Sequence, residues 1–278
     1  MMFQILRRGF SMLELIFVII ILGIVSSIGA EIIASVYSSY ILQRAQHRAS
    51  IKTELAATQI ANRLAYAIPG TIVRKTGTGV GGTDINEVGN VTDQTLQWVG
   101  ADADSFKAFT SNANRLPGWS GFCDLAASTT ASISTPGSSL TLVNTIKGNL
   151  GLTSNPQIYF PSESGLMSYQ ATLVAPSTIT LSNYIAPPSG ASAKIVEHYK
   201  LATSSYALVV SNTGDLTLYY NFTPQRGIAI GGSSELLLRN VSTFEFRGDG
   251  RTLRFKICSD EKIGEINPIT ICKEKAVF

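Results

Sequence analysis

The most apolar stretch of the chain covers residues 10–30 and reads FSMLELIFVIIILGIVSSIGA. It holds 21 residues and a single ionisable side chain, that of Glu14. A helix of about 20 apolar residues spans the hydrocarbon core of a bilayer. The pattern therefore predicts a membrane-spanning helix with one carboxylate near its start.

The next 38 residues, 31–68, contain neither proline nor glycine and continue a helical pattern. Apolar positions recur at spacings of mostly three, four or five, as expected for a helix with one buried face. These positions are Ile33, Val36, Tyr37, Tyr40, Ile41, Ile51, Leu55, Ile60, Leu64 and Ile68. The polar face would carry Arg44, His47, Arg48, Lys52 and Arg63.

The helix is predicted to stop at Pro69-Gly70, since proline disfavours helix at the residue before it. From residue 10 to residue 68 there are 59 residues, which makes roughly 88 Å at about 1.5 Å per residue. Its first half would cross the membrane and its second half would lie against a sheet. The alternative is two helices that break near Ser38-Ser39.

The C-terminal third alternates in the manner of strands. Tyr206, Leu208 and Val210 precede the turn at residues 211–215, and Leu216, Leu218 and Tyr220 follow it. Pairing of residue 210 with residue 216 gives a hairpin with a five-residue loop.

A second hairpin is predicted around residues 248–250, with Phe244 and Phe246 on the same face as Leu253, Phe255 and Ile257. In that register Glu245 lies opposite Arg254. Both hairpins together predict an antiparallel sheet whose apolar face covers the helix.

The middle of the chain, residues 71–195, is rich in Gly, Ser, Thr and Asn. Residues 77–82 match GxGxxG, and Asp102 follows at nearly the distance of a ribose-binding acid. A dinucleotide site needs a strand before this turn and a helix after it. Neither is indicated, so we predict a flexible loop.

The large aromatic residues of the region are expected to pack a small subdomain or its interface; they are Trp98, Phe106, Phe109, Trp119 and Phe122.

Charge sets the expected topology. Arg7 and Arg8 precede the apolar run and no acidic residue does. The positive-inside rule then keeps the N-terminus in the cytoplasm. One alternative is a cleaved secretory signal peptide, with small residues at 26–30 as the cleavage site, and another is a plain membrane anchor. Neither alternative gives Glu14 a task, although a carboxylate within hydrocarbon usually marks function.

The stretch Gly9-Phe10-Ser11-Met12-Leu13-Glu14 resembles the N-terminal signature of type IV prepilins and type II secretion pseudopilins. Ser11-Met12 is a mild variation on the commoner Thr-Leu. The resemblance implies that prepilin peptidase cleaves after Gly9 and that Phe10 becomes N-methylated. It also implies the inner membrane of a bacterium as the location, with the C-terminal domain in the periplasm and later in a pilus or pseudopilus.

Cleavage would give Glu14 a partner. It creates an α-amino group at Phe10, whose ordinary pKa is about 8, and methylation keeps its charge. A carboxylate that is costly alone in hydrocarbon is tolerable when paired. Glu14 is therefore expected to act in assembly, through the ammonium of its own chain or of a neighbouring subunit. The alternative is a Glu14 that lies among the lipid headgroups at little cost.

The resemblance implies an α+β fold of the pilin kind, a long N-terminal helix packed on an antiparallel sheet domain. The expected parts are a leader at residues 1–9, a membrane and filament-core helix at 10–34, and a periplasmic helix half at 35–68. A variable region at 69–195 and a C-terminal sheet with a disulfide loop at 196–278 follow.

Two features favour a minor subunit over a major pilin. Major pilins often carry a proline near the position of Ala30-Glu31, and this chain has none there, although Gly23 and Gly29 lie upstream. Residues 235–250, ELLLRNVSTFEFRGDG, are similar to the sheet of larger minor pilins of the J or W type. The open alternatives are a major structural pilin and a filament-borne receptor for DNA or a surface.

The chain has three cysteines. Cys258 and Cys272 bracket the last strand region, and pilins often close a C-terminal disulfide loop. Such a bond requires an oxidising compartment such as the periplasm. Cys123 is left over, and its pairing with either of the others stays open.

Little in the sequence indicates catalysis, and we expect neither an enzyme nor a cofactor. The two histidines, His47 and His198, form no HExxH motif, and residues 118–122 miss the GxSxG pattern at the last position. Asp260, Glu261 and Glu265 offer oxygen ligands that calcium prefers, but their spacing matches no defined loop, so a solvated acidic turn is expected.

Nucleic-acid binding is not favoured by the charge balance. The formal net charge is +3, and it falls to +1 without the two leader arginines. Basic side chains gather near the second hairpin at Arg239, Arg247, Arg251, Arg254 and Lys256. Residues 226–278 nevertheless carry nine basic and seven acidic residues, which is an ordinary mixed surface. The resemblance to prepilins implies prepilin peptidase, other pilin subunits and inner-membrane lipid as partners, and nucleic acid stays an open but disfavoured one.

Overall fold

The computed structural model describes residues 11–89, 94–111, 113–162, 165–186, 190, 192, 194–263 and 266–277. The chain divides into two compact units. One contains residues 1–49 with residues 261–269, and the other contains residues 50–260 with residues 270–278. Each unit is described by itself.

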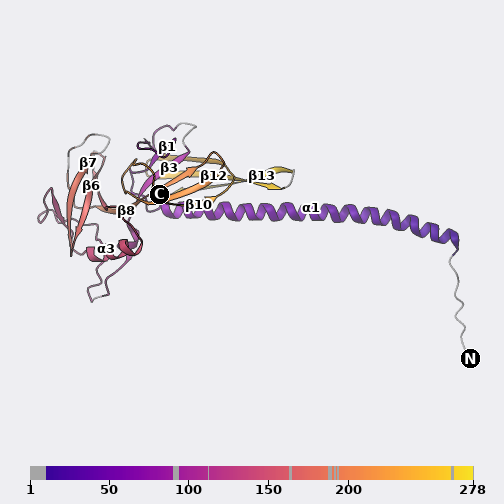
Figure 1. Ribbon diagram of the computed structural model, residues 1–278, viewed down its shortest axis with the longest axis horizontal. Coiled ribbons are helices and arrows are strands. Elements are labelled where there is room, and N and C mark those ends of the chain that lie inside the picture. The colour runs from indigo at the N-terminus through magenta and orange to yellow at the C-terminus, as the bar shows by residue number, and fades with distance from the viewer. Residues whose placement is uncertain are drawn as a thin grey trace, which may run out of the picture. The chain divides into compact units, whose positions relative to one another are not determined.

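One unbroken helix, α1 (Met12–Leu64), carries the N-terminal apolar run and 53 residues in all (Figure 1). The predicted single helix is confirmed, and no break occurs at Ser38-Ser39. Gly23 and Gly29 lie inside the helix with no other atoms within 4 Å of a Cβ built on them. The helix ends earlier than Ile68, because the backbone N–H of Ile68 donates to Val99 O at 2.9 Å instead.

The buried face of the last helical turns differs from the predicted one. Ile51 and Leu55 are 53% and 58% exposed, so the prediction that they face a core is wrong. Small residues take that place, since Thr53, Ala56 and Ala57 are buried together with Ile60 and Leu64, which were predicted correctly. Small side chains let the helix approach the sheets closely, and the larger side chains between them point to solvent.

The larger sheet has ten strands, and all of its pairings are antiparallel. Its path is β2-β1-β3-β8-β5-β6-β7-β4, with β9 beside β8 and β10 beside β9. The strands are β1 (Val73–Lys75), β2 (Thr83–Asp84), β3 (Thr95–Ala101), β4 (Ser132–Ser134), β5 (Gln157–Ser162), β6 (Gly165–Val174), β7 (Thr178–Ile185), β8 (Lys200–Val210), β9 (Leu216–Phe222) and β10 (Ser233–Leu238). Two short helices, α2 (Ala103–Lys107) and α3 (Leu140–Asn149), lie between strands in the sequence.

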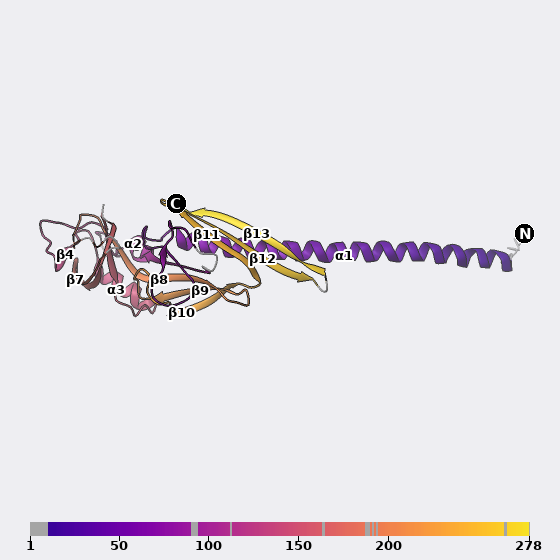
Figure 2. The same ribbon diagram turned by 90° about the horizontal axis from the view of Figure 1, so that it is seen from above.

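A separate sheet contains β11 (Val241–Asp249), β12 (Thr252–Ile263) and β13 (Ile266–Val277), in that order (Figure 2). The two predicted hairpins both exist, but they belong to different sheets, which corrects the prediction of a single one. In the first hairpin Val210 pairs with Leu216 as predicted.

The register of the second hairpin differs from the predicted one by two residues. Glu245 lies opposite Lys256 and not Arg254, because β11 and β12 extend to Asp249 and Thr252 and leave a two-residue loop. A shift by two keeps every side chain on its face. The shared apolar face of Phe244, Phe246, Leu253, Phe255 and Ile257 is therefore retained.

Two main cores support the second unit. The first joins the end of α1 to both sheets through Ile60, Trp98, Leu208 and Phe255. The second lies around α3 and β5–β7. Of the aromatic residues predicted to pack the middle region, Trp98 and Trp119 are buried at 0% and 5% exposure. Three others are largely exposed: Phe106, Phe109 and Phe122.

Candidate functional site

The prepilin-like signature lies partly outside the described residues, which begin at Ser11 and so leave out Arg7, Arg8, Gly9 and Phe10. Glu14 is exposed in the first turn of α1, and its backbone N–H donates to the Ser11 hydroxyl at 3.3 Å. Ser11 and Glu14 thus have the spacing of a capping box, S-x-x-E, directly before an apolar run. The S-x-x-E pattern is present at residues 11–14 of the sequence and adds to the signals described above. It gives Glu14 a second role, because a carboxylate in the first turn stabilises the helix dipole.

Apolar side chains are exposed on every side of α1 between residues 12 and 42. Phe17, Ile21, Val25 and Ile28 are each between 55% and 61% exposed. Within the described part of the chain, α1 is the one helix long and apolar enough to cross a membrane. Such a surface needs lipid or other apolar helices around it, because a helix that is hydrophobic all round is normally buried.

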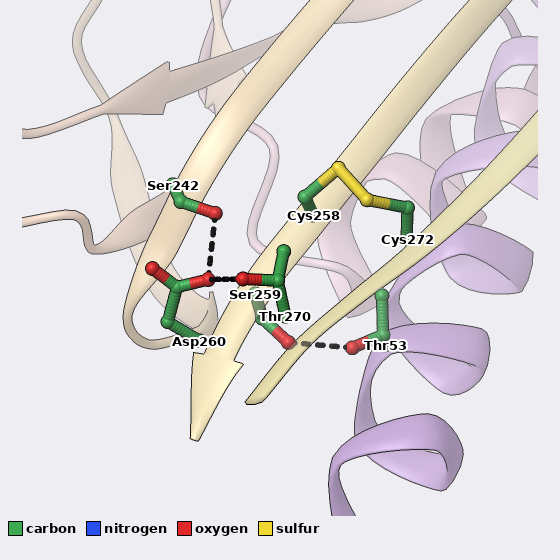
Figure 3. Close-up of a disulfide and its surroundings, with 7 residues drawn as sticks. All are labelled: Thr53, Ser242, Cys258, Ser259, Asp260, Thr270 and Cys272. Atoms are coloured by element: carbon green, nitrogen blue, oxygen red, sulfur yellow. Dashed lines mark hydrogen bonds between the residues drawn. A yellow bond between two sulfur atoms is a disulfide. The ribbon is translucent and has the colours of Figure 1, made fainter. Parts of the chain in front are cut away.

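Polar contacts and a disulfide tie the C-terminal strands together and to α1 (Figure 3). Cys258 and Cys272 are bonded across β12 and β13, as the sequence predicted. Next to this bond, the buried Thr53 and Ser259 hydroxyls lie 2.7 Å apart, which joins α1 to β12. A buried hydroxyl pair with this geometry satisfies both groups and fixes their separation.

Glu54 makes a second link, from α1 to β13. Its carboxylate accepts a hydrogen bond from Lys275 Nζ, and Lys273 Nζ lies 3.5 Å from Glu54 Oε2. The hydrogen bond from Lys275, followed by the charges of both lysines, lowers the pKa of Glu54. These contacts hold the last strand against the helix at the surface of the second unit.

Acid should weaken the link between α1 and β13. Because the folded pKa of Glu54 is lowered, its stabilising contribution is present above the ordinary pKa and is lost as the pH falls through the folded pKa. We expect Glu54→Gln to unfold at a lower denaturant concentration than the wild type at neutral pH, and this difference should shrink as the pH falls below the ordinary pKa of a glutamate. Glu235→Gln, an exposed carboxylate on β10, is the control and should show no such difference.

Removal of the disulfide should cost about 3 kcal/mol of unfolding free energy, because the bond closes a loop of about 15 residues. The test compares urea unfolding of the full chain with that of a Cys258→Ser and Cys272→Ser double variant. The wild type in reductant should match the double variant. Equal stability of oxidised and reduced wild type would contradict the expectation, and mass mapping without reductant should link residue 258 to residue 272.

Cys123 is free and buried. Its pairing with another cysteine, left open by the sequence, is not seen, since the other two are bonded to each other. Burial raises the pKa of the Cys123 thiol, and the hydrogen bond with the Ser128 hydroxyl only partly opposes this effect. A thiol with a raised pKa is a poor nucleophile.

Two of the other candidate chemical groups, His198 and Ser120, line the same pocket, beside Trp119 and Tyr199. His47 is exposed on α1, and His198 Nε2 lies 3.7 Å from Glu197 Oε1. Ser120 belongs to a cluster of hydroxyl groups with Thr135 and Ser138. Within the described residues the Ser120 hydroxyl bonds to these hydroxyl groups and not to the His198 imidazole, whereas a serine nucleophile needs a base as its partner.

Residues 77–82 form a loop, as predicted, but a strand that the sequence did not indicate, β1, precedes them. The loop connects β1 to β2, no helix follows, and Gly81 N donates to Gly227 O at 2.7 Å. Asp102 instead caps α2, because its side chain accepts from Ser105 N. A dinucleotide site of the GxGxxG kind therefore does not fit this segment.

The acidic turn offers no metal cluster within the described residues, where no group of three or more His, Cys, Asp or Glu side chains comes together. Asp260 Oδ1 accepts from the Ser242 and Thr270 hydroxyls at 3.0 and 2.7 Å. Glu265, the third residue considered for calcium, lies outside the described residues.

The basic residues of the second hairpin lie on an exposed face of mixed charge. Lys256 is opposite Glu245, whereas Arg247 is opposite Arg254. All four side chains are exposed, and the remaining basic residues of the group, Arg239 and Arg251, are exposed as well. Two acidic residues, Glu245 and Asp249, lie exposed among them and weaken the field that phosphate groups would meet.

Comparison with known protein families, with curated proteins and with solved structures found no match to this chain. Its class therefore rests on architecture. A 53-residue apolar N-terminal helix is joined to a large antiparallel sheet domain. This is an α+β arrangement consistent with a pilin-like fold.

Proposed function

We propose that this chain is a minor pilin or pseudopilin, a non-enzymatic subunit that helps to initiate, cap or build a type IV pilus or a type II secretion pseudopilus. One observation carries the proposal. The signature at residues 9–14 leads directly into an unbroken helix of 53 residues, which is apolar and exposed at its start and packed into a sheet domain at its end. A secretory signal peptide would need neither the length of this helix nor its carboxylate.

The proposed route begins in the bacterial inner membrane, with the leader in the cytoplasm and the sheet domain in the periplasm. Arg7 and Arg8 support this orientation, and the Cys258–Cys272 bond agrees with an oxidising compartment. Prepilin peptidase would cleave after Gly9, and Phe10 would then be N-methylated. The exposed apolar side chains of α1 would exchange lipid for the helices of neighbouring subunits.

The size of the sheet domain and the absence of proline from the helix favour a minor subunit. Residues 50–260 with 270–278 build two main cores and ten of the strands in one sheet. The helix also has no proline at which it could loosen in a filament. A subunit of this kind contributes through a distinctive domain at one end and helix packing at the other.

The test is quantitative mass spectrometry of filaments sheared from the native cells. We expect a peptide that begins with methylated Phe10, at trace abundance beside a dominant pilin. Cells without prepilin peptidase are the control and should lack this peptide. A dominant amount of the chain would make it the major pilin, and a mature N-terminus near residue 30 would make it a secreted protein instead.

A further inference from the structure

A large open cavity lies at the junction of α1, α2 and the middle of the ten-stranded sheet, within the second unit. Its volume is about 690 Å³, which is within the range of small-ligand sites. The walls come from four separate parts of the chain: residues 59–66 at and just after the end of α1, residues 100–107 around the start of α2, Leu150 and Leu152 after α3, and residues 203–221 of β8 and β9. The function proposed above gives this cavity no task.

The backbone around the cavity departs from regular strand geometry at two places, Gly100 and Asn221. A Cβ on Gly100 would lie 2.6 Å from Tyr206 Cε2, so glycine is what allows the tyrosine ring to lie across β3. Asn221 has φ of +61°, and the pairing of β8 with β9 shifts register beside it. Bulges of this kind re-aim side chains and are frequent next to binding sites.

Two residues that line the cavity, Asp102 and Asn221, each carry a buried acceptor without a partner in the described part of the chain. Asp102 is only 7% exposed, and while its Oδ1 accepts from Ser105 N at 3.1 Å, its Oδ2 has no hydrogen-bond partner among the described residues. Asn221 Oδ1 is likewise buried without a partner there, although its Nδ2 donates to Gly151 O at 3.2 Å. Buried acceptor atoms in proteins normally receive a hydrogen bond. Two acceptors without one, on residues that line the same cavity, therefore indicate a ligand that donates hydrogen bonds.

Formal charge in the cavity is balanced. Arg63 and Lys107 supply two positive charges, and Asp102 and Asp104 supply two negative ones. A phosphate or a strongly acidic ligand would meet the carboxylates, and a cation would meet the basic groups. The balance favours a neutral ligand that can both donate and accept hydrogen bonds at many points.

Three tyrosine rings, those of Tyr66, Tyr206 and Tyr220, provide apolar faces on the same walls. Tyr66 is 42% exposed, and its ring is held by Lys107, whose Nζ lies 4.6 Å from the ring centre. Tyr206 is stacked on Trp98 at 5.8 Å and has the Arg63 guanidinium 5.6 Å from its ring centre, so the rings that remain for a ligand are those of Tyr66 and Tyr220. Tyrosine offers a flat apolar face with a polar end, which suits the C–H face and the hydroxyl groups of a sugar ring.

We propose that this cavity binds a neutral saccharide, with Asp102 and Asn221 accepting hydrogen bonds from its hydroxyl groups and a tyrosine ring covering one sugar face. The donors of Arg63, Lys107 and Asn62 would reach the ring and hydroxyl oxygens. The inference stands on the second unit alone and does not depend on processing or filament assembly.

The test uses the purified full chain in lipid nanodiscs, since many detergents carry sugar headgroups. Saturation-transfer difference NMR would be recorded with maltose, lactose, cellobiose and N,N′-diacetylchitobiose at millimolar concentration. We expect transfer to at least one of them, with the saccharide protons nearest the tyrosines most strongly saturated. Inorganic phosphate should not compete.

Two variants locate the binding. Asp102→Asn keeps the acceptor for Ser105 N but exchanges the other oxygen for a donor, and Tyr66→Ala removes an exposed ring. Each should weaken saccharide binding at least about tenfold, equivalent to about 1.4 kcal/mol. Asp249→Asn and Phe109→Ala are the matched controls, because they change an exposed carboxylate and an exposed ring away from the cavity. Both should bind as the wild type does.

Two results would overturn the proposal. One is the absence of transfer to all four saccharides by folded wild-type protein. The other is unchanged binding in both Asp102→Asn and Tyr66→Ala, which would place the saccharide elsewhere. The thermal unfolding profile of each variant confirms that it is folded, and because Tyr66 is largely exposed, its variant remains informative if Asp102→Asn fails to fold.

Discussion

Replacing Glu14 by glutamine is expected to reduce incorporation of this chain into filaments by at least about tenfold, while cleavage after Gly9 continues. Glutamine keeps the size of the side chain but cannot pair with the charged N-terminus that cleavage leaves on Phe10. Loss of one partner from a desolvated ion pair typically costs about 3–5 kcal/mol, so even partial desolvation in a filament gives a tenfold effect. The measurement is the ratio of processed chain in sheared filaments to processed chain in cells.

Two controls separate the proposed pairing from other roles of this carboxylate. Glu31→Gln removes the other exposed carboxylate in the first half of α1 and should leave incorporation near the wild-type level. Ser11→Ala removes the hydroxyl that accepts from Glu14 N while leaving the carboxylate. If Ser11→Ala impairs incorporation as strongly as Glu14→Gln, helix capping is the explanation and the pairing with Phe10 is not.

The helix could be predicted from sequence because its signal is long and local. An apolar run followed by 38 residues without proline or glycine leaves few alternatives to helix. The buried face is harder to predict, because periodicity favours large apolar residues such as Leu55 as the buried ones. Ala56 and Ala57 carry the close contact instead, and Leu55 lies in solvent. Side-chain size does not show which residues a neighbouring sheet approaches.

For the hairpins, too, contacts between residues close in sequence could be predicted and contacts between distant segments could not. The turn at residues 211–215 fixes the pairing of Val210 with Leu216, so that register could be predicted. Nothing local shows that this hairpin joins β3 in one sheet while Phe255 lies in another. The strands β5–β7 were missed because their alternation is interrupted by Ser, Thr, Gln and Asn on a largely polar face.

The saccharide cavity was beyond prediction for a related reason. It unites α1, the β3–α2 junction and the β8–β9 pair, which are up to about 160 residues apart in the chain. In the sequence, Asp102 stands out only as the distant acid of a GxGxxG match, and Gly100 has no distinguishing neighbour. The conformation of Asn221 and the closeness of Gly100 to Tyr206 exist only in the folded sheet.

Ile60→Ala should destabilise the second unit by about 2–5 kcal/mol, whereas Leu55→Ala should change the unfolding free energy by no more than about 0.5 kcal/mol. Ile60 is fully buried in the core that contains Trp98 and Phe255, so truncation leaves a cavity between the helix and two sheets. Leu55 lies one turn earlier and is 58% exposed, so its loss removes little contact. Both substitutions shorten an aliphatic side chain to alanine, which makes them a matched pair.

Urea unfolding of the full chain in detergent micelles measures this difference. The chain has two tryptophans, and they belong to different cores: Trp98 to the one with Ile60, and Trp119 to the other. A Trp119→Phe background therefore leaves Trp98 fluorescence as a reporter of the core that Ile60 occupies. Equal losses in the two variants, or a larger loss for Leu55→Ala, would mean that the helix packs on the face that carries Ile51 and Leu55. The packing of α1 against the sheets through Ala56 and Ala57 would then be contradicted. The position of residues 59–66 in the wall of the cavity would be contradicted as well, because it depends on the same face of the helix.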